Sequence, residues 1–398
     1  MGQSCRLCRF VTKRIHVSGK VDTSLGQPQT KGNFGLPLCS CRVSPSKIAI
    51  FGDGVTVAQK FLVLLVQVRI LIPESFTQPH SEMPMTLSAI ILAAGKATRM
   101  KSPMVKVLHE ICGRPMLAYV LDACRAVGVQ RMYVVVGHDR ERVMRTFADA
   151  KDITWVTQEE QKGTGHACLV CRDAFNLPAE LTGKEELGHT FVLCGDGPLI
   201  RAQTLQELLD KHQAAQAGVT LATSILSNPA GYGRIVRDTA GKVTGIVEQN
   251  DATDAQKQIC EVNPSYYLYR TADLFASLAQ VKPNNKKGEY YLTDTLAIIR
   301  NSGKVVEALP AVPPEDVLSI NSRADLAAVN RVMQQRIQAE VMASGVTIVS
   351  PENTWIEFGA KIGEDVVLCP FTWVGTGAVV PANTTLAAGS VLKRPGGA

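Results

Sequence analysis

Hydrophobic residues from Ser88 onward follow two alternating patterns. Continuous apolar runs predict strands buried on both faces at residues 89–93, 132–136, 153–157, 191–194 and 219–226. Between these runs, apolar residues at helical spacing predict helices over 117–127, 140–150, 163–175 and 204–217. Such alternation is typical of an α/β fold: a Rossmann-like, mostly parallel sheet with helices on both faces and a site at the carboxyl ends of its strands.

Two later stretches break this alternation. Residues 231–270 are mostly extended, which predicts a β-rich layer over one side of the site. Residues 321–344 place apolar positions at helical spacing and predict one long connecting helix. We therefore expect the sheet domain to end before this helix.

Beyond the helix, the hydrophobic period changes to six. The aliphatic residues of this repeat are Ile356, Ile362, Leu368, Val374, Val380, Leu386 and Leu392. Strict repetition every six residues is typical of a parallel β-helix, in which each hexad forms one side of a triangular coil. Seven hexads at three per coil predict little more than two coils.

Residues 1–85 look unlike the rest, and the segment between Cys8 and Cys39 is polar and lacks periodicity. Their one apolar run, 61–72, contains Gln67 and Arg69 and is too short to span a bilayer, so we expect no membrane association. Cysteine pairs at 5/8 and 39/41 suggest a zinc site, but the second spacing is tight. We expect a disordered extension, or a region upstream of a true start at Met83 or Met85.

Composition narrows the function class only slightly. The net charge of +6 is spread along the chain, suits a phosphorylated substrate and gives no basic block for nucleic acid. The eleven cysteines, an odd number without a secretory signal, favour a reducing, cytoplasmic location. We expect buried free thiols at the cysteines within apolar segments: Cys112, Cys124, Cys168, Cys171, Cys194, Cys260 and Cys369.

The loop after the first strand carries the clearest candidate chemistry. Gly95 ends the strand, and the cations Lys96, Arg99, Lys101 and Lys106 follow. A glycine there lets backbone N–H groups turn towards an anion, and the cations would neutralise phosphate charge. The spacing matches neither a Walker A nor a GxGxxG motif, so a plain solvated loop remains the alternative.

Three further strand ends bring polar residues to the same edge of the sheet. They contribute Gln158 with Gly163 and Thr164, then Asp196, then Gly233 and Glu248. A carboxylate that ends a buried strand, such as Asp196, is a good Mg²⁺ ligand together with phosphate oxygens and water. Each feature has a simpler reading: Asp196 as a turn-forming residue, Thr164 as a helix cap, and residues 231–233 as a turn.

From about residue 88 to 345, the chain resembles the N-terminal domain of the bifunctional N-acetylglucosamine-1-phosphate uridyltransferase/glucosamine-1-phosphate acetyltransferase family. The opening loop, shared by most sugar nucleotidyltransferases, is Leu92-Ala-Ala-Gly-Lys-Ala-Thr-Arg-Met-Lys-Ser102, followed by Lys106-Val-Leu-His109. The remaining matches are Gln158, Gly163-Thr-Gly-His-Ala167, Gly195-Asp196, Pro198-Leu199, Gly231-Tyr-Gly-Arg-Ile235, Ile246-Val-Glu248, Asp251-Ala-Thr253, Glu261-Val-Asn263, Gly288-Glu-Tyr-Tyr-Leu-Thr-Asp294 and Ile320-Asn-Ser-Arg323. The elements after the opening loop are those that indicate uridine and N-acetylglucosamine.

The resemblance implies that UTP and N-acetylglucosamine 1-phosphate are converted to UDP-N-acetylglucosamine and pyrophosphate. It assigns phosphate contacts and charge stabilisation to Arg99 and Lys106, and Mg²⁺ ligation to Asp196 and Asn321. Gln158, Gly163 and Thr164 would read the uracil. The nucleotide would also be seated by Leu92, Ala93, Ala94 and Gly95, with Gly195 beside the metal ligand. The sugar would be bound by Gly233, Glu248 and Asn263.

Several positions depart from the family pattern. Ala97 replaces a usual glycine where the loop approaches phosphate, and Val105 replaces a usual proline. Gly197 replaces a usual valine, and Pro264-Ser265 replaces a usual Thr-Gly beside the sugar site. The family's acetyltransferase domain is a much longer β-helix whose catalytic histidine and acetyl-CoA residues have no counterpart here. We therefore expect no acetyltransferase activity.

The expected domains follow from these boundaries: 1–85 as the extension, 86–318 as the nucleotidyltransferase domain, 319–345 as the connecting helix, and 346–398 as a short left-handed β-helix. The β-helices of this family form trimers, whereas two coils leave only a small interface, so trimer and monomer both stay open. Two functional alternatives also stay open. One is the same chemistry on another sugar phosphate or nucleotide, such as glucose 1-phosphate or dTTP, and the other is a catalytically silent subunit that binds a sugar nucleotide and regulates a partner.

Overall fold

The computed structural model describes residues 86–95, 98–177 and 187–393. The extension expected at 1–85 and the substituted Ala97 lie outside the described residues, as does Lys96 of the opening loop.

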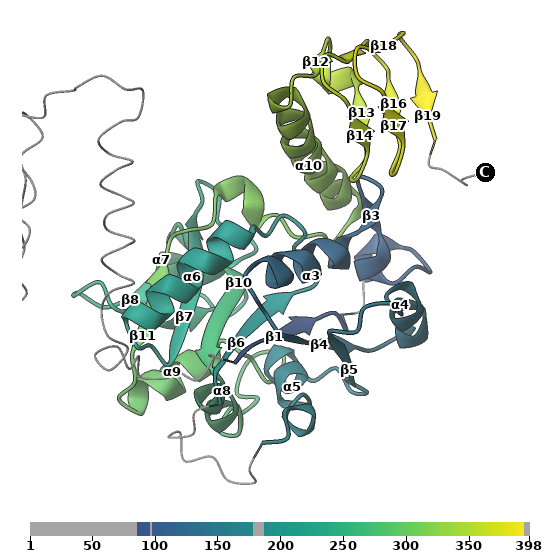
Figure 1. Cartoon of the computed structure of the whole chain (residues 1–398). Helices are drawn as coiled ribbons and strands as arrows, with labels where there is room; N and C mark the ends of the chain where they lie inside the picture. Colours follow the sequence, from purple (N-terminus) through teal and green to yellow (C-terminus); the bar gives the residue numbers. More distant parts are fainter. Residues whose placement is uncertain (1–85, 96–97, 178–186, 394–398) are drawn as a thin grey trace, which may run out of the picture. The chain divides into compact units, whose positions relative to one another are not determined.

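A central sheet runs in the order β11–β7–β10–β6–β1–β4–β5 (Figure 1). Its strands are β1 (Leu87–Leu92), β4 (Arg131–Val136), β5 (Ile153–Thr157), β6 (His189–Cys194), β7 (Val219–Ile225), β10 (Glu261–Arg270) and β11 (Val306–Leu309). Strand β10 is antiparallel to both of its neighbours, and the other pairings in this row are parallel. The predicted mostly parallel α/β sheet is confirmed.

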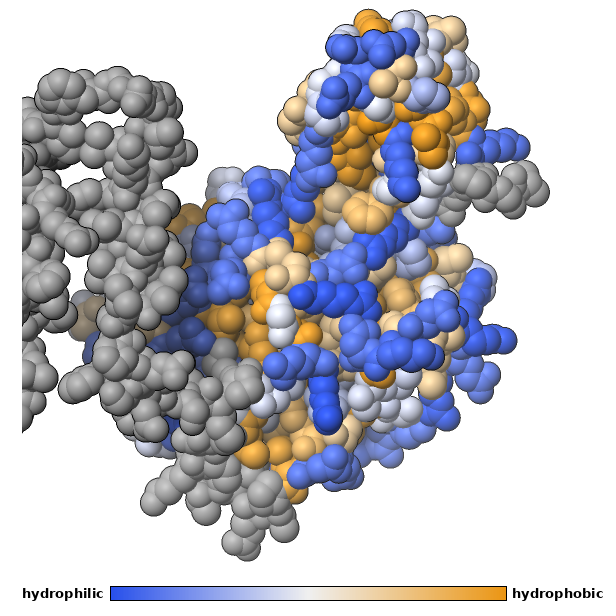
Figure 2. Space-filling model, viewed as in Figure 1, coloured by the Kyte–Doolittle hydropathy of each residue, from blue (hydrophilic) through white to orange (hydrophobic). Residues whose placement is uncertain are grey.

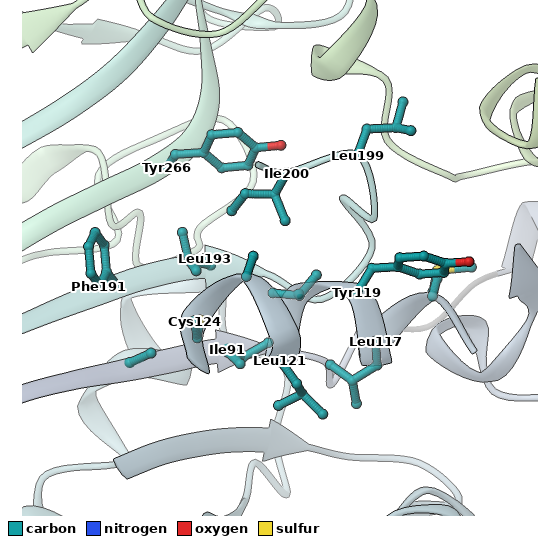
Figure 3. Packing of buried hydrophobic residues seen from close by; sticks show 14 of the residues in the cluster. Ile91, Leu117, Tyr119, Leu121, Cys124, Phe191, Leu193, Leu199, Ile200 and Tyr266 are labelled. Atoms are coloured by element: carbon teal, nitrogen blue, oxygen red, sulfur yellow. The ribbon is translucent and has the colours of Figure 1, made fainter. Parts of the chain in front are cut away.

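The two faces of the sheet are covered by different helices. Ala89 and Ile91 of β1 point into one buried cluster with α3 (Met116–Ala126) and α6 (Ala202–Ala214). Ile90 points to the opposite face, where it packs with α5 (Thr164–Leu169), α8 (Thr271–Leu278) and α9 (Asp294–Asn301). Figure 3 shows residues of the first cluster, among them Ile91 of β1 with Leu121 and Cys124 of α3. Alternate strand residues face opposite sides, so an unbroken apolar run is what a strand covered on both faces requires.

An antiparallel arm extends from the start of β10. Strand β8 (Gly233–Arg237) pairs with β10 and with β9 (Val243–Val247), and the short helix α7 (Asp254–Lys257) follows. This arm confirms the extended layer predicted for residues 231–270. The register of β10 shifts between Val262 and Tyr266, which marks a bulge at the base of the arm.

The long helix α10 (Arg323–Ala343) confirms the predicted connecting helix. It begins with a capping box: the Ser322 hydroxyl accepts a bond from the Asp325 amide, and the Asp325 carboxylate accepts one from the Ser322 amide. Its buried Gln334 bonds to both the amide and the carbonyl of Ile356, the first residue of the six-residue repeat. Arg336 bonds to the buried Asp316 and to the Leu199 carbonyl. The helix is thereby fixed to the sheet domain and to the repeat region.

The C-terminal repeat forms a left-handed parallel β-helix with three faces. These are β12 (Thr347–Ile348), β15 (Val367–Leu368) and β18 (Thr385–Leu386); β13 (Trp355–Ile356), β16 (Trp373–Val374) and β19 (Val391–Leu392); and β14 (Lys361–Ile362) with β17 (Val379–Val380). Equivalent residues lie 18 apart, as Ile356, Val374 and Leu392 do. The six-residue period thus predicted both the architecture and its register.

The outer surface of the β-helix carries apolar side chains. Phe371, Val379 and Val391 are 67%, 63% and 62% exposed. Figure 2 shows hydrophobic surface gathered on this part of the molecule. The trimer that the resemblance implies stays a prediction.

Three expectations from the sequence were wrong in detail. The helix expected over 140–150 is α4 (Arg140–Thr146), because residues 148–149 are exposed and offer no apolar face for packing. The helix expected over 163–175 ends at Leu169, with a separate 3-10 turn at Asp173–Phe175. Cys260 is exposed rather than buried, because it lies in the loop that precedes β10, whereas Cys194 and Cys369 are half-buried.

Candidate active site

A cavity of about 320 Å³ lies at the carboxyl end of β1. The predicted nucleotide-binding residues that line it are Leu92, Ala93, Ala94, Gly95, Lys106, Gln158, Gly163, Thr164 and Asp196. They come from the ends of β1, β5 and β6 and from the start of α5, because parallel strands end at one edge of the sheet. This part of the expected convergence is present in the structure, whereas Arg99, Gly233 and Glu248 do not line this cavity.

Lys106 lies at the centre of this edge. Its Nζ donates to Asp196 Oδ2 at 2.5 Å and to Asn321 Oδ1 at 2.9 Å. The Lys106 side chain is 12% exposed and that of Asp196 is 22% exposed, so the pair is largely removed from bulk water. Asp196 and Asn321, which lie far apart in the sequence, thus both contact the ammonium group of Lys106.

The local backbone explains how Asn321 reaches Asp196. The Ile320 amide donates to the Asp196 carbonyl at 3.2 Å, which ties the two segments together. The Asn321 amide donates to Asp325 Oδ2 at 3.0 Å, beside the capping box of α10. Asn321 therefore sits immediately before the helix, and the start of the helix holds it in place.

Asp196 and Asn321 fit a magnesium site. Their side-chain oxygens both contact one ammonium group, which shows that they converge on a single cation position. Mg²⁺ is bound by one or two such oxygens together with phosphate oxygens and water. Among the described residues, no group of three or more His, Cys, Asp or Glu side chains is arranged to hold a metal ion.

The segment 288–294 packs against the start of α5. The Gly165 amide donates to the Tyr290 carbonyl at 2.8 Å, and the Thr164 hydroxyl accepts from the Leu292 amide at 3.1 Å. Gly163 has φ of +105°, and a methyl group there would lie 2.6 Å from the Tyr290 oxygen. Glycine is therefore required at this approach. The reading of Thr164 as a helix cap is wrong, because its hydroxyl binds another segment and Gly163 is the N-cap residue.

A second cavity, of about 530 Å³, lies beside the antiparallel arm. Glu248, Tyr291, Thr293 and Asp294 are among its lining residues, while Glu289 of the same 288–294 segment lines the first cavity. This segment therefore lies between the two cavities. Such an arrangement suits two substrates that must be brought together.

The three predicted sugar-binding residues form one group at the base of the arm. A methyl group on Gly233 would lie 3.6 Å from Glu248 Oε2 and 3.7 Å from the Asn263 Cβ. Asn263, which is 6% exposed, donates from Nδ2 to the Tyr267 hydroxyl at 2.5 Å. The same methyl group on Gly233 would lie only 3.0 Å from Ile246 Cγ2, so a larger residue than glycine would be crowded at this position.

The substituted Pro264-Ser265 pair occupies the bulge of β10. Ser265 has φ of +67°, in the left-handed region that favours glycine, and its amide donates to Asn263 Oδ1 at 3.0 Å. Pro264 is tolerated within the strand because the regular pairing is interrupted there. The backbone conformation that a glycine would adopt is thus retained by a serine.

The pKa values of three side chains that line the second cavity are raised. Burial raises the pKa of Glu248 above its ordinary value, and nearby Lys287 partly opposes the shift. Burial, and then the Asp251 carboxylate, raise the pKa of Asp294. The same two causes raise the pKa of Tyr291 to about 12. This cavity therefore carries carboxylates that are held close together and partly desolvated.

Several other positions differ from expectation or were missed. Arg99 is exposed in the turn Thr98–Met100 and does not line either cavity described above. Val105 has φ of −57°, close to the value that proline imposes, so the missing proline changes little there. Gln161, which bonds to the Ala94 carbonyl at 2.5 Å, lines the first cavity and was missed. The sequence offered one indication that Gln161 belongs to the site, namely its position between Gln158 and Gly163.

In the part of the chain that the structure describes, no helix has the length and apolar character needed to cross a membrane.

Comparisons with known proteins agree with this geometry. Residues 89–290 match the family model of the MobA-like NTP transferase domain. The bifunctional protein GlmU of Geotalea daltonii is 40% identical over 307 residues, which cover 77% of this chain and 65% of that protein. Bifunctional protein GlmU of Listeria monocytogenes serotype 4b is 41% identical over 304 residues, covering 76% of this chain and 64% of that protein. The chain thus spans less than two thirds of the length of these relatives.

Among solved structures, UDP-glucose pyrophosphorylase complexed with UDP-glucose covers 63% of this chain and 100% of its own, with 17% identity and a TM-score of 0.49. The sequence relatives confirm the resemblance that the motifs indicated. The family match spans the strands and loops that form the first cavity. The chain therefore belongs to the MobA-like NTP transferase domain family and is a relative of the bifunctional GlmU proteins.

Proposed function

We propose that the protein is a Mg²⁺-dependent uridyltransferase that forms UDP-N-acetylglucosamine and pyrophosphate from UTP and N-acetylglucosamine 1-phosphate. The observation that carries the proposal is the meeting of Lys106, Asp196 and Asn321 beside the first cavity, which Lys106 and Asp196 line. Motifs matching the uridyltransferase line both cavities. The 40% identity to bifunctional GlmU proteins supports the same assignment.

The reaction joins two phosphates without a covalent enzyme intermediate. An oxygen of the sugar phosphate attacks the α-phosphorus of UTP, a new P–O bond forms, and the bond to the β-phosphate oxygen breaks as pyrophosphate leaves. The nucleotide would occupy the cavity at Leu92–Gly95, and the sugar would occupy the arm side at Gly233, Glu248 and Asn263. The protein's contribution is to place the two phosphates in line and to neutralise their charge.

Lys106 is the cation best placed for this work. Its ammonium lies at the mouth of the nucleotide cavity and would stabilise the negative charge that grows on the leaving pyrophosphate. Asp196 and Asn321 would hold Mg²⁺, which supplies further charge neutralisation at the phosphates when bound. Arg99 would have to move inward from its exposed turn to contribute.

Glu248 and Asn263 suit a hydroxylated, acetamido sugar. The carboxylate can accept hydrogen bonds from sugar hydroxyls, and the Asn263 amide can bond an acetamido group. Gly233 lies beside both residues and adds no side chain of its own to this group. The acidic surroundings of Glu248 favour a neutral, hydroxyl-rich group on this side and the phosphate on the Lys106 side.

Pyrophosphate release with UTP, Mg²⁺ and N-acetylglucosamine 1-phosphate tests the proposal. We expect turnover in the wild type and none with Asp196→Ala. Turnover no greater than that of the variant would overturn the proposal. Tight calorimetric binding of UDP-N-acetylglucosamine without turnover would instead support the silent regulatory subunit.

A substrate panel then settles the choice of substrates. Ser265, which has a positive φ, lies beside Asn263 and departs from the family pattern, and this departure is the reason to test a different sugar. Glucose 1-phosphate and dTTP should be poorer substrates than N-acetylglucosamine 1-phosphate and UTP. Equal or better turnover with glucose 1-phosphate would assign the enzyme to that sugar.

A further inference from the structure

Two hydrogen-bond acceptors hold the side-chain amide of Gln158, and both contact its nitrogen atom, Nε2. Its Nε2 lies 3.3 Å from the Gly163 carbonyl oxygen and 3.0 Å from His166 Nδ1. A carbonyl oxygen can only accept a hydrogen bond, so the atom that faces it must be the NH₂ group. That group has two protons and can donate one to each neighbour. His166 Nδ1 must then act as an acceptor, with the ring proton on Nε2.

His166 is built into a rigid position. It is the third residue of α5, whose first turn is held against the 288–294 segment by the bond from the Gly165 amide to the Tyr290 carbonyl. Its ring centroid lies 6.4 Å from that of Tyr290. Burial, and then nearby Lys162, lower the pKa of His166 below its ordinary value, while Glu160 opposes the shift. The ring is therefore unprotonated at neutral pH and keeps its acceptor.

The other end of the Gln158 amide is open. Gln158 is 5% exposed and lines the first cavity. With Nε2 bound on the α5 side, Oε1 has no hydrogen-bond partner among the described residues. The acceptor oxygen is thus the free end of an amide that would otherwise be able to rotate and present either atom.

We propose that His166 is a positioning residue that fixes the Gln158 amide with its oxygen available to the base, and so selects uracil over cytosine. The inference rests on the proposed function, because it takes Gln158 as the residue that reads the base. Uracil presents an N3–H donor, which Oε1 can accept. Cytosine presents an unprotonated N3, which would face Oε1 acceptor to acceptor. Rejecting the wrong base by an unpaired polar group is an effective form of discrimination.

Two substitutions of His166 distinguish the effect of its acceptor nitrogen from the effect of the size of its ring. His166→Phe keeps a planar ring and removes the acceptor, so the Gln158 amide becomes free to turn. His166→Asn places an amide oxygen near the position of Nδ1 and restores an acceptor for Nε2. The quantity to measure is the ratio of kcat/KM for UTP to that for CTP, together with the ratio of their dissociation constants. Thermal unfolding of each variant confirms that it is folded.

We expect His166→Phe to lower the UTP to CTP ratio by about tenfold, the effect of one hydrogen bond in a desolvated site. His166→Asn should retain most of the wild-type ratio. An unchanged ratio in His166→Phe would overturn the inference, as would equal losses in both variants. The dissociation constants report on selectivity even if turnover is absent. A wild-type protein that binds UTP and CTP equally would instead overturn the uridine assignment itself.

Discussion

The ammonium of Lys106 bonds at 2.5 Å to Asp196 Oδ2, an oxygen that we propose as a magnesium ligand. It bonds at 2.9 Å to Asn321 Oδ1, the second proposed ligand. A cation that neutralises a carboxylate also competes with any other cation for it. In this arrangement, a metal ion and Lys106 cannot both take the same place between the two oxygens.

Lys106→Met should therefore change metal binding in the absence of nucleotide. Removing the ammonium leaves the Asp196 carboxylate unpaired, so Mn²⁺, used as a spectroscopic substitute for Mg²⁺, should bind about fivefold to tenfold more tightly. UTP should bind more weakly, because a phosphate-facing cation is lost. Electron paramagnetic resonance measures the free Mn²⁺ directly. Lys101→Met, at an exposed position of the same loop, is the matched control. Equal Mn²⁺ affinity in wild type and Lys106→Met would contradict this view of the site.

Glu248→Gln should affect the sugar and leave the nucleotide alone. The substitution keeps the shape of the side chain beside Gly233 but removes the charge that strengthens hydrogen bonds to hydroxyl groups. The KM for the sugar phosphate should rise about 10-fold to 100-fold. The dissociation constant of UTP should stay within about twofold of the wild-type value. Asp254→Asn, on the exposed helix α7, is a suitable control. Parallel weakening of UTP and sugar binding would count against separate subsites.

Ser265→Gly should stabilise the protein relative to Ser265→Ala. Position 265 has φ of +67°, where a residue with a Cβ costs about 1–2 kcal/mol more than glycine. Both variants lose the serine hydroxyl, which bonds to the Cys194 thiol, so their difference isolates the backbone. Denaturant unfolding should give a free energy about 1 kcal/mol higher for the glycine variant. A lower free energy for glycine than for alanine would show that the bulge relaxes without strain.

Acid should destabilise the fold through a buried histidine pair. His212 is fully buried, and its ring bonds to His189 at 3.0 Å and to the Thr220 hydroxyl at 2.8 Å. Burial, and then the neighbouring His189 and Arg270, lower the pKa of His212 from 6.5 to about 3. Between pH 6.5 and about 3, His212 is therefore protonated in the unfolded chain but not in the folded chain. Stability is present above pH 6.5 and is lost as the pH falls towards 3.

His212→Gln removes this titration and keeps a hydrogen-bonding side chain. Its unfolding free energy should fall less steeply with decreasing pH, by about 1.4 kcal/mol per pH unit within the interval. Chemical unfolding at a series of pH values gives the slope. His138→Gln, at an exposed position, should reproduce the wild-type slope. A His212→Gln slope equal to that of the wild type would mean that other groups dominate the acid sensitivity.

Most of the fold could be predicted from the periodicity of hydrophobic residues in the sequence. The apolar run around Ile90 predicted a two-sided strand, and the six-residue repeat through Ile356 predicted the coils of the β-helix. The meeting of Asp196 with the opening loop was also predictable, because parallel strands end at one edge. These features depend on local pattern and on one topological rule.

The remainder depends on contacts between distant, aperiodic segments. The bond from the Leu292 amide to Thr164 joins residues 128 apart, and it decides that Thr164 is not a cap. The acceptor role of His166 follows from one carbonyl oxygen, which no spacing reveals. Arg99 was expected in the site on motif alone, yet its turn leaves it exposed.

The reversed direction of β10 separates the residues proposed for the sugar from those proposed for the nucleotide. Strands β1 and β6 end at the site and carry the nucleotide-side residues, whereas β10 begins there and delivers Asn263 as the chain enters the sheet. The residues proposed for the sugar, Gly233, Glu248 and Asn263, lie in one stretch of chain that forms an arm attached at a bulge, and the 288–294 segment completes the second cavity beside it. Such a layout is modular. If the proposed function holds, exchanging the arm would alter part of the sugar site, while the strands that carry the proposed nucleotide residues would keep their register.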